Sequence, residues 1–513
     1  MLTLAGILLA MFLGALDQTI VSTALPRIAA DLHGLDRFTW VATAYLVAST
    51  ALVPIYGKLA DMYSRRKIEI VAVNIFLVGS MLCGLAGELG PLPLLGDGMN
   101  QLVVFRAVQG FGGAGLFAMA FIIIADLFAP AERGRYQGFT GAVFGTSSVL
   151  GPLLGGFLTD RGTGLIPGVA GWRLVFYVNL PLGLLALWFI ITQMPPLRPR
   201  TEPKPFDFLS AVLLMAGLGP LVVALQLNKS QYGWSAPLTL GLLGVAAVAL
   251  GLFVVRSLRH ENPILNFGLF KNKVFRTANA ALFFMGGAFL GVIIFEPLFM
   301  VNVLGESATR AGASLIPLSL GVVTGSLLAG QMVSRFGHYK YWMLAGLSLL
   351  LIGLSLLATM PDTVQYHQVL IYLAICGLGL GPTMPLYTLA VQNATEPSLV
   401  GQATSASQFF RQIGGAIAAS ELGMVLTLTL AQNLPAAASP LATRYPAVAE
   451  APVLPSVAAT AGPNPVVRAA FSKAISRVYF FTIFLVVGGF VLTFFIPELP
   501  LRKSNDAGPV AAE

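Results

Sequence analysis

Long apolar runs, separated by short polar segments, follow one another along almost the whole chain. A helix needs about 20 residues to cross a hydrocarbon core of about 30 Å. Fourteen runs have roughly this length, at about 2–28, 39–59, 68–88, 101–125, 136–159, 173–193, 208–228, 236–256, 275–301, 310–333, 341–360, 368–392, 402–430 and 474–497. The pattern therefore predicts an all-α membrane protein with fourteen spans.

The composition supports this prediction and excludes other classes. Hydrophobic residues make up 56% of the chain and charged residues only 10%, against about 25% charged in soluble proteins. So few charges cannot cover a water-facing surface, which excludes a soluble globular enzyme. Cys83 and Cys376 both lie inside apolar runs, which argues against a disulfide framework. The four histidines are dispersed, so no metal site is predicted.

The basic residues mark the ends of the apolar runs and so indicate topology. With the N-terminus inside, 18 of the 30 basic residues fall on the cytoplasmic side and ten outside, while Arg106 and Arg411 lie within spans. The positive-inside rule then favours cytoplasmic N- and C-termini. The net charge of +8 is explained in this way, and no nucleic-acid partner is predicted. Asp17 lies inside the first run, which has no basic leader, so a signal peptide is not expected.

Two cytoplasmic turns at equivalent places suggest an internal repeat. Residues 57–67 (GKLADMYSRRK) follow the second span, and residues 330–340 (GQMVSRFGHYK) follow the second of the last six. We predict six-helix halves at 1–194 and 273–513, joined by a linker at 195–272 that carries two extra spans. Residues 431–472, rich in Ala and Pro, are predicted to be extracellular. They form either a plain linker or extensions of the flanking helices beyond the bilayer.

Five motifs in order carry a resemblance to a known family. They are 16–26 (LDQTIVSTALP), 57–67, 106–110 (RAVQG), 151–156 (GPLLGG) and 172–181 (WRLVFYVNLP). Over nearly its whole length the chain resembles the major facilitator superfamily, in particular its fourteen-helix drug:proton antiporter branch. Met62 and Ser64 stand where the family usually has a basic residue and a glycine. Ser334 replaces the acid of the second-half turn, so only Asp61 is expected to act as a full gate partner.

Asp17 is the first functional candidate, because a carboxylate inside a span is costly and usually functional. At about 1.5 Å per residue it lies roughly 20 Å from the inner end of its helix, which is also the depth of Arg106. The resemblance implies that these helices are neighbours. We therefore predict proton coupling by Asp17, Arg106 and, in the second half, Arg411. The alternative is that Asp17 only orients a packed helix.

The candidates for substrate binding are Asp17, Gln109, Glu296 and Glu421. Arg411 keeps its proton, so it needs an acid, carbonyls or water nearby. Glu296 and Glu421 are the acids available in the second half. Either one serves coupling or cation recognition, or it is a hydrated residue at the membrane interface.

The resemblance also implies a gate and a seal. The turn at 57–67 is expected to latch the cytoplasmic side, with the loop after the fourth span as its partner, although a solvated charge run is the simpler alternative. The motif at 151–156 is expected to let helices slide while it seals the cavity, although it could serve packing alone. The predicted gating residues are Gly57, Asp61, Arg65, Arg66, Asp126, Arg133, Arg135, Gly151, Pro152, Gly155 and Gly156.

The resemblance and the composition together predict a proton-coupled exporter of amphipathic or cationic organic compounds. It is expected in the cell membrane as a monomer, with a small or lipophilic substrate, protons and lipids as partners. No cofactor is expected, since the sequence has no G-x-x-x-x-G-K-[ST] loop and the proton gradient would supply the energy. Rival cargoes are an endogenous lipid, an amino acid or a siderophore. A membrane enzyme would need clustered catalytic residues at one depth, and the motif at 151–156 argues against a channel.

Overall fold

The computed structural model describes residues 1–34, 37–93, 95–164, 166, 168–197, 205–227, 232–433 and 465–504. These residues contain fourteen helical segments that are long and apolar enough to cross a membrane. Their regular secondary structure is helical, apart from one isolated bridge between Leu92 and Gly96. The prediction of an all-α protein with fourteen spans is therefore confirmed.

The first six spans are formed by seven helices, because the sixth is divided in two. These helices are α1 (Leu2–Asp31), α2 (Phe38–Met62), α3 (Arg65–Leu85), α4 (Gly98–Leu127), α5 (Pro130–Arg161), α6 (Gly171–Tyr177) and α7 (Asn179–Gln193). The two inserted spans are α8 (Phe208–Gln226) and α9 (Pro237–Arg259).

The last six spans contain α10 (Lys273–Asn302), α11 (Ala308–Ala313), α12 (Leu315–Phe336), α13 (Lys340–Ala358), α14 (Tyr366–Leu380), α15 (Thr383–Asn393), α16 (Val400–Asn433) and α18 (Pro465–Phe494). Helices α16 and α18 extend into the predicted extracellular segment 431–472 from both ends, and its extracellular position stays a prediction. Residues 434–464 of that segment lie outside the described residues.

Side chains at the helix ends explain several of the observed boundaries. The carboxylate of Asp97 accepts a hydrogen bond from the Asn100 backbone N–H (2.9 Å) and starts α4. Asn272 does the same for the first turn of α10. Gly337 ends α12 in the left-handed region, at φ 78°. Such caps satisfy backbone groups that a helix leaves unpaired at its ends.

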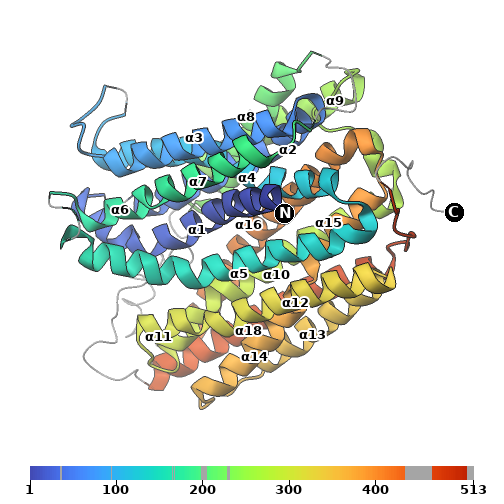
Figure 1. Ribbon diagram of the computed structural model, residues 1–513. Coiled ribbons are helices and arrows are strands. Elements are labelled where there is room, and N and C mark those ends of the chain that lie inside the picture. Colours follow the sequence, from blue (N-terminus) through green and yellow to red (C-terminus); the bar gives the residue numbers. More distant parts are fainter. Residues whose placement is uncertain are drawn as a thin grey trace.

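Both ends of the described chain lie at the same end of the helical bundle. Thr3 Oγ1 donates to the Gln193 carbonyl (2.8 Å), which places the start of α1 beside the end of α7. The Ala131 N–H donates to the Arg502 carbonyl (3.1 Å), which joins the start of α5 to the segment after α18. We call this end of the bundle the terminal face and the opposite end the far face. The helices run between the two faces (Figure 1).

The apolar core is divided into separate clusters for the first and the second half of the chain. Two clusters of buried residues are built from residues 7–194, and one large cluster is built from residues 269–499. A fourth cluster joins Leu214 and Leu218 of α8 and Phe253 of α9 to Ile55 of α2 and Ile413 of α16. The inserted pair thus covers the seam where α2 meets α16, one helix from each half.

The two halves are in contact from the terminal face to about the middle of the bundle. Along one seam, shown in Figure 1, α5 lies beside α12, and the Ser326 hydroxyl donates to the Gly138 carbonyl (3.0 Å). Along the other, α2 lies beside α16, and Thr50 Oγ1 donates to Gln412 Oε1 (2.9 Å). The structure is therefore a state in which the terminal face is closed.

Candidate functional site

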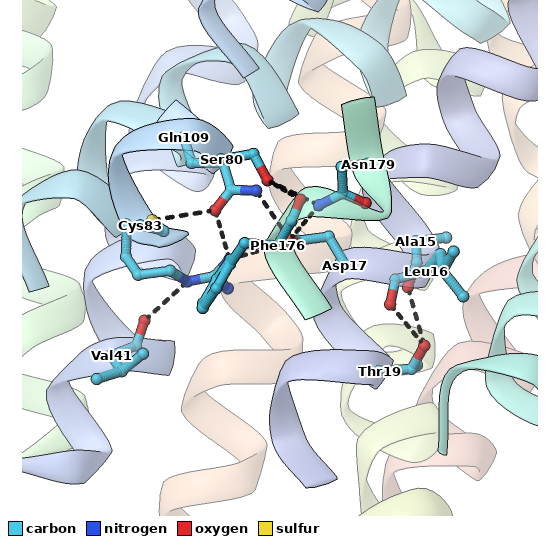
Figure 2. A network of polar contacts seen from close by, with 11 residues as sticks. Ala15, Leu16, Asp17, Thr19, Val41, Ser80, Cys83, Gln109, Phe176 and Asn179 are labelled. Carbon is cyan, nitrogen blue, oxygen red and sulfur yellow. Dashed lines mark hydrogen bonds and ion pairs between the residues drawn. The ribbon is translucent and has the colours of Figure 1, made fainter. Parts of the chain in front are cut away.

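Asp17 is held at the centre of a polar network inside the first half. Its side chain is fully buried, with 0% exposure. Arg106 Nη1 donates to Oδ2 (2.5 Å), while Gln109 Nε2 (2.8 Å) and Asn179 Nδ2 (3.0 Å) donate to Oδ1. Both carboxylate oxygens therefore have partners, which come from α4 and α7 (Figure 2).

Arg106 is held from several directions as well. Its Nη1 also donates to Gln109 Oε1 (2.7 Å), and its Nε donates to the Val41 carbonyl (3.3 Å). The guanidinium carbon lies 4.5 Å from the centre of the Tyr45 ring. Asp17, Arg106 and Gln109 thus form a closed triangle of hydrogen bonds. The structure brings the three together, as the common depth of Asp17 and Arg106 predicted, and leaves their role as a prediction.

Asn179 is a member of this network that sequence reasoning missed. The sixth span is interrupted at Val178, and Asn179 begins α7 there. Its Nδ2 donates both to Asp17 and to the Ser80 hydroxyl (2.9 Å), which in turn donates to the Phe176 carbonyl. The available signal was an Asn followed by a Pro two residues later, inside an otherwise apolar run. A helix break there exposes polar groups that need partners.

This network can exist in two states, one with the Asp17–Arg106 ion pair and one with a proton on Asp17. Arg106 retains its charge under all ordinary conditions, so a proton can enter only at Asp17. A protonated Asp17 no longer attracts Arg106, and a buried cation without its partner is strongly destabilising. Protonation would therefore force α1 and α4 to rearrange or water to enter.

The predicted counterpart in the second half has a different environment. Arg411 is half-buried on α16, and its guanidinium donates to Gln408 Oε1 on the same helix (3.2 and 3.4 Å). It forms no ion pair with any acid in the described ranges. The structure therefore does not join Arg411 to Glu296 or Glu421.

The two glutamates of the second half are separated as well. Glu296 on α10 has 0% exposure, and its Oε2 accepts a hydrogen bond from the Tyr479 hydroxyl of α18 (2.6 Å). The alternative of a hydrated interfacial residue is therefore wrong for Glu296 in this state. Glu421, ten residues beyond Arg411 on α16, has an exposed side chain.

Asp61 at the end of α2 binds the start of a helix in the opposite half. Its two carboxylate oxygens accept hydrogen bonds from the backbone N–H groups of Gly401 (2.8 Å) and Gln402 (2.9 Å). These residues open α16, where unpaired N–H groups and the helix dipole attract an anion. Gly57, one turn earlier, packs so closely on Ser405 that a Cβ there would overlap it. Both contacts cross the seam between α2 and α16.

The basic residues beside Asp61 bind within their own half. Arg65 is buried and pairs with Asp126 at the end of α4 (2.7 Å). Arg66 donates to the Ile191 carbonyl near the end of α7. Asp126, one of the predicted partners of this turn, thus pairs with Arg65, although it lies in the last turn of α4 and not in the loop; the latch role of the pair stays a prediction. The contact that crosses to the other half is made by Asp61 with backbone groups.

The second-half turn makes an equivalent but weaker contact. Ser334 Oγ accepts from the Arg135 backbone N–H (3.2 Å) in the first part of α5. Gly330, like Gly57, packs against the backbone of the opposite half, here at Gly134. The side chain of Arg135 is exposed. The repeat of residues 57–67 and 330–340 is therefore visible in the packing, and Ser334 takes the position of Asp61 without its charge.

Gln392 of α15 joins the two halves at the terminal face and was not predicted. Its Nε2 donates to Thr404 Oγ1 (2.9 Å) and to the Phe121 carbonyl (3.3 Å). Its Oε1 accepts from Gln137 Nε2 (2.8 Å) and Arg133 Nη1 (3.3 Å). Arg133, a predicted gating residue, thus reaches the opposite half through Gln392. The only available signal was a polar residue within a span.

The motif at 151–156 packs α5 onto α1. A Cβ at Gly151 would overlap Thr19, and one at Gly155 would overlap Thr23. A Cβ at Gly156 would have no atom of the described residues within 4 Å, so Gly156 is not needed for close packing in this state, and its gating role stays a prediction. Pro152 lies inside α5, which continues unbroken around it.

Comparisons with known proteins agree with this architecture. The model of the Major Facilitator Superfamily matches residues 7–419. The multidrug transporter protein MdtP of Bacillus subtilis is 37% identical over 83% of this chain and 75% of its own length. Multidrug resistance protein 3 of the same organism is 39% identical over 84% and 80%, respectively.

The fold is also that of solved transporters. The structure of the proton:xylose symporter XylE matches with a TM-score of 0.61 at 15% identity, over 97% of this chain and 96% of the symporter. A bacterial homologue of the human lysosomal transporter Spinster matches with a TM-score of 0.57 at 18% identity, over 96% of each chain. The chain belongs to the Major Facilitator Superfamily and is an integral membrane protein.

Proposed function

We propose that this protein exports amphipathic or cationic organic compounds in exchange for protons, by alternating access. The observation that carries the proposal is the buried Asp17–Arg106 pair. A single proton at Asp17 would cancel the attraction between α1 and α4, so proton binding and helix movement are linked at one residue. The energy would come from the proton gradient, without a bound cofactor.

The cargo class is proposed from the relatives and from charge. Both Bacillus relatives are named for multidrug transport or resistance. A cationic compound would compete with the proton, and with Arg106, for the carboxylate of Asp17. An endogenous lipid, amino acid or siderophore is the rival cargo on the same fold.

The distribution of basic residues supports a cell-membrane protein with the terminal face in the cytoplasm. In that orientation the closed seams seal the cytoplasmic side, and the site would be reached from outside. Asp61 on the start of α16 would hold this closure, and its release would allow the opposite state. The protein would act as a monomer, surrounded by lipid.

Transport in proteoliposomes tests the proposal. A proton gradient, acidic inside, should drive uptake of a fluorescent monovalent organic cation against its own gradient, and a protonophore should abolish that uptake. A neutral lipid analogue serves as the comparison cargo. Uptake at the same rate with and without the proton gradient would contradict proton coupling. Coupled movement of the lipid alone would favour the rival cargo.

A further inference from the structure

The second half contains a buried acid that the proposed cycle does not use. Glu296 lies on α10 with no part of its side chain exposed. Its Oε2 accepts from the Tyr479 hydroxyl at 2.6 Å. Its Oε1 is buried and has no hydrogen-bond partner among the described residues. One neutral donor is thus the only partner found for the whole carboxyl group.

The surroundings of Glu296 are apolar. Its chain neighbour Phe295 and the nearby Phe299 belong to the core cluster of this half. The titratable groups that interact with it are Tyr479 on α18 and, on α14, Cys376 and Tyr366. No cation of the helices packed on α10 forms an ion pair with it in the described part of the chain. On α11 and α16, Arg310 and Arg411 bind Glu306 and Gln408 instead.

A carboxylate in this position would be poorly stabilised. An ionised Glu is an acceptor only, with about four lone-pair sites, and it needs a counter-charge or several donors when it is buried. Asp17 illustrates the requirement, since it has three donors and one of them is a cation. Among the described residues, Glu296 has neither a cation nor a second hydrogen-bond donor. A protonated, neutral carboxyl group carries no charge and therefore needs fewer such partners.

We infer that Glu296 carries a proton in this terminal-face-closed state, and that the Glu296–Tyr479 pair is a second proton-binding site. On uptake an O–H bond forms at the carboxyl group, and on release that bond breaks and the proton passes to water. As a step in exchange this inference rests on the proposed function. It would place one proton site in each half of the molecule.

The packing of α10 provides a way to open the site. Gly287 and Gly291 bring α10 close to α16 and α18: a Cβ at Gly291 would lie 2.9 Å from Thr482 Oγ1 of α18. Pro297, directly after Glu296, removes one backbone hydrogen bond of α10. A movement of α10 against α18 would separate Glu296 from Tyr479 and admit water, and the acid would then ionise.

Infrared spectroscopy of the purified protein in lipid tests the inference directly. A protonated carboxylic acid has a C=O stretching band that a carboxylate lacks. Because Glu69 of α3 is also buried and neither of its carboxyl oxygens has a hydrogen-bond partner among the described residues, the test follows the component of this band that comes from Glu296. We expect that component in the wild type at neutral pH, its loss in Glu296→Gln, and its persistence in Asp17→Asn. Tyr479→Phe should keep the band but shift its frequency, because one hydrogen bond is lost.

The outcomes separate this inference from the proposed function. A band that is absent from the wild type, or unchanged in both Glu296→Gln and Tyr479→Phe, would overturn the proton at Glu296 while proton-driven export by Asp17 still stood. The shift in Tyr479→Phe remains decisive if Glu296→Gln fails to fold. If the band behaves as expected but a proton gradient drives no uptake, the proposed function fails and the proton at Glu296 stands.

Discussion

At the residue scale, the buried acids Asp17 and Glu296 have opposite surroundings. Asp17 is surrounded by three donors that include a guanidinium, so its ionised form is well matched to its site. Glu296 has a single neutral donor and an unpartnered oxygen. If both acids titrate during transport, proton uptake breaks an ion pair in the first half and restores a neutral contact in the second.

Asp61 provides a prediction on the closure of the terminal face. Asp61→Ala removes two charge-assisted hydrogen bonds to α16, each worth about 1.5–3 kcal/mol. We expect the closed state to lose about 3 kcal/mol, which is roughly a 100-fold shift toward the open state. Spin labels at Lys67 and Glu396, exposed near the terminal face in opposite halves, would report this as a longer distance.

Ser334→Ala is the matched control for Asp61→Ala, because Ser334 takes the equivalent position in the second half and makes only neutral hydrogen bonds among the described residues, from the Arg135 N–H and to the Glu132 carbonyl. We expect Ser334→Ala to shift the equilibrium toward the open state by at most a few-fold. Equal distance distributions for Asp61→Ala and the wild type would show that Gln392 and the packing of α5 on α12 hold the closure without Asp61.

At the scale of elements, α5 packs on α1 through Gly151 and Gly155, which lie four positions apart on the same face of α5. Gly155→Leu would place a branched side chain against Thr23, which overpacks the interface at a cost of about 1–3 kcal/mol. We expect turnover in proteoliposomes to fall by about tenfold or more, while the dissociation constant of the substrate changes little.

Gly156→Leu controls for the added side chain, because the space around a Cβ at Gly156 is open. It should transport at close to the wild-type rate. If Gly155→Leu instead weakens substrate binding strongly and leaves turnover unchanged, this part of α5 lines the binding site and does not serve movement.

The inserted pair α8–α9 is fixed at its terminal-face end by Asp207. Although burial alone raises its pKa, hydrogen bonds from Arg256 and Ser210 lower the pKa of Asp207 to about 2. A lowered folded-state pKa contributes stability that is present above the unfolded pKa of about 3.9 and is lost as pH falls toward 2. The stabilisation is therefore complete at neutral pH.

Thermal unfolding in detergent should detect this contribution. Asp207→Asn should lower the melting temperature at pH 7, and the difference from the wild type should shrink between about pH 4 and pH 2. A difference that stays constant over this range would mean that Asp207 acts through its hydrogen bonds to α8 alone and not through its charge.

At the scale of the whole molecule, the sequence was sufficient for the fold and for part of the site. Apolar length identifies a membrane helix because the bilayer requires it, so all fourteen spans were found. The common depth of Asp17 and Arg106 follows from the rise per residue. The contacts of Asn179 and Gln392 depend on which helices meet and on how each is rotated, and neither property can be read from one sequence.

The burial of Glu296 was missed for the same reason. Its position along α10 was known, but its partner Tyr479 lies 183 residues away on α18. Gly156 shows that a motif alone does not tell which of its glycines packs closely, since a Cβ at Gly156 would meet no atom of the described residues within 4 Å. Composition and the length of apolar runs identify the helices, whereas tertiary packing sets which face each helix turns toward its neighbour.

The most direct test of the central claim is substrate-driven proton movement in proteoliposomes, with the wild type and Asp17→Asn compared at equal insertion. Asn at this position keeps an acceptor for Arg106 but cannot take up a proton. The account predicts that addition of the organic cation moves protons through the wild type and that Asp17→Asn moves none, although it remains folded. Coupled proton movement by a correctly inserted Asp17→Asn variant at the wild-type rate would contradict the account.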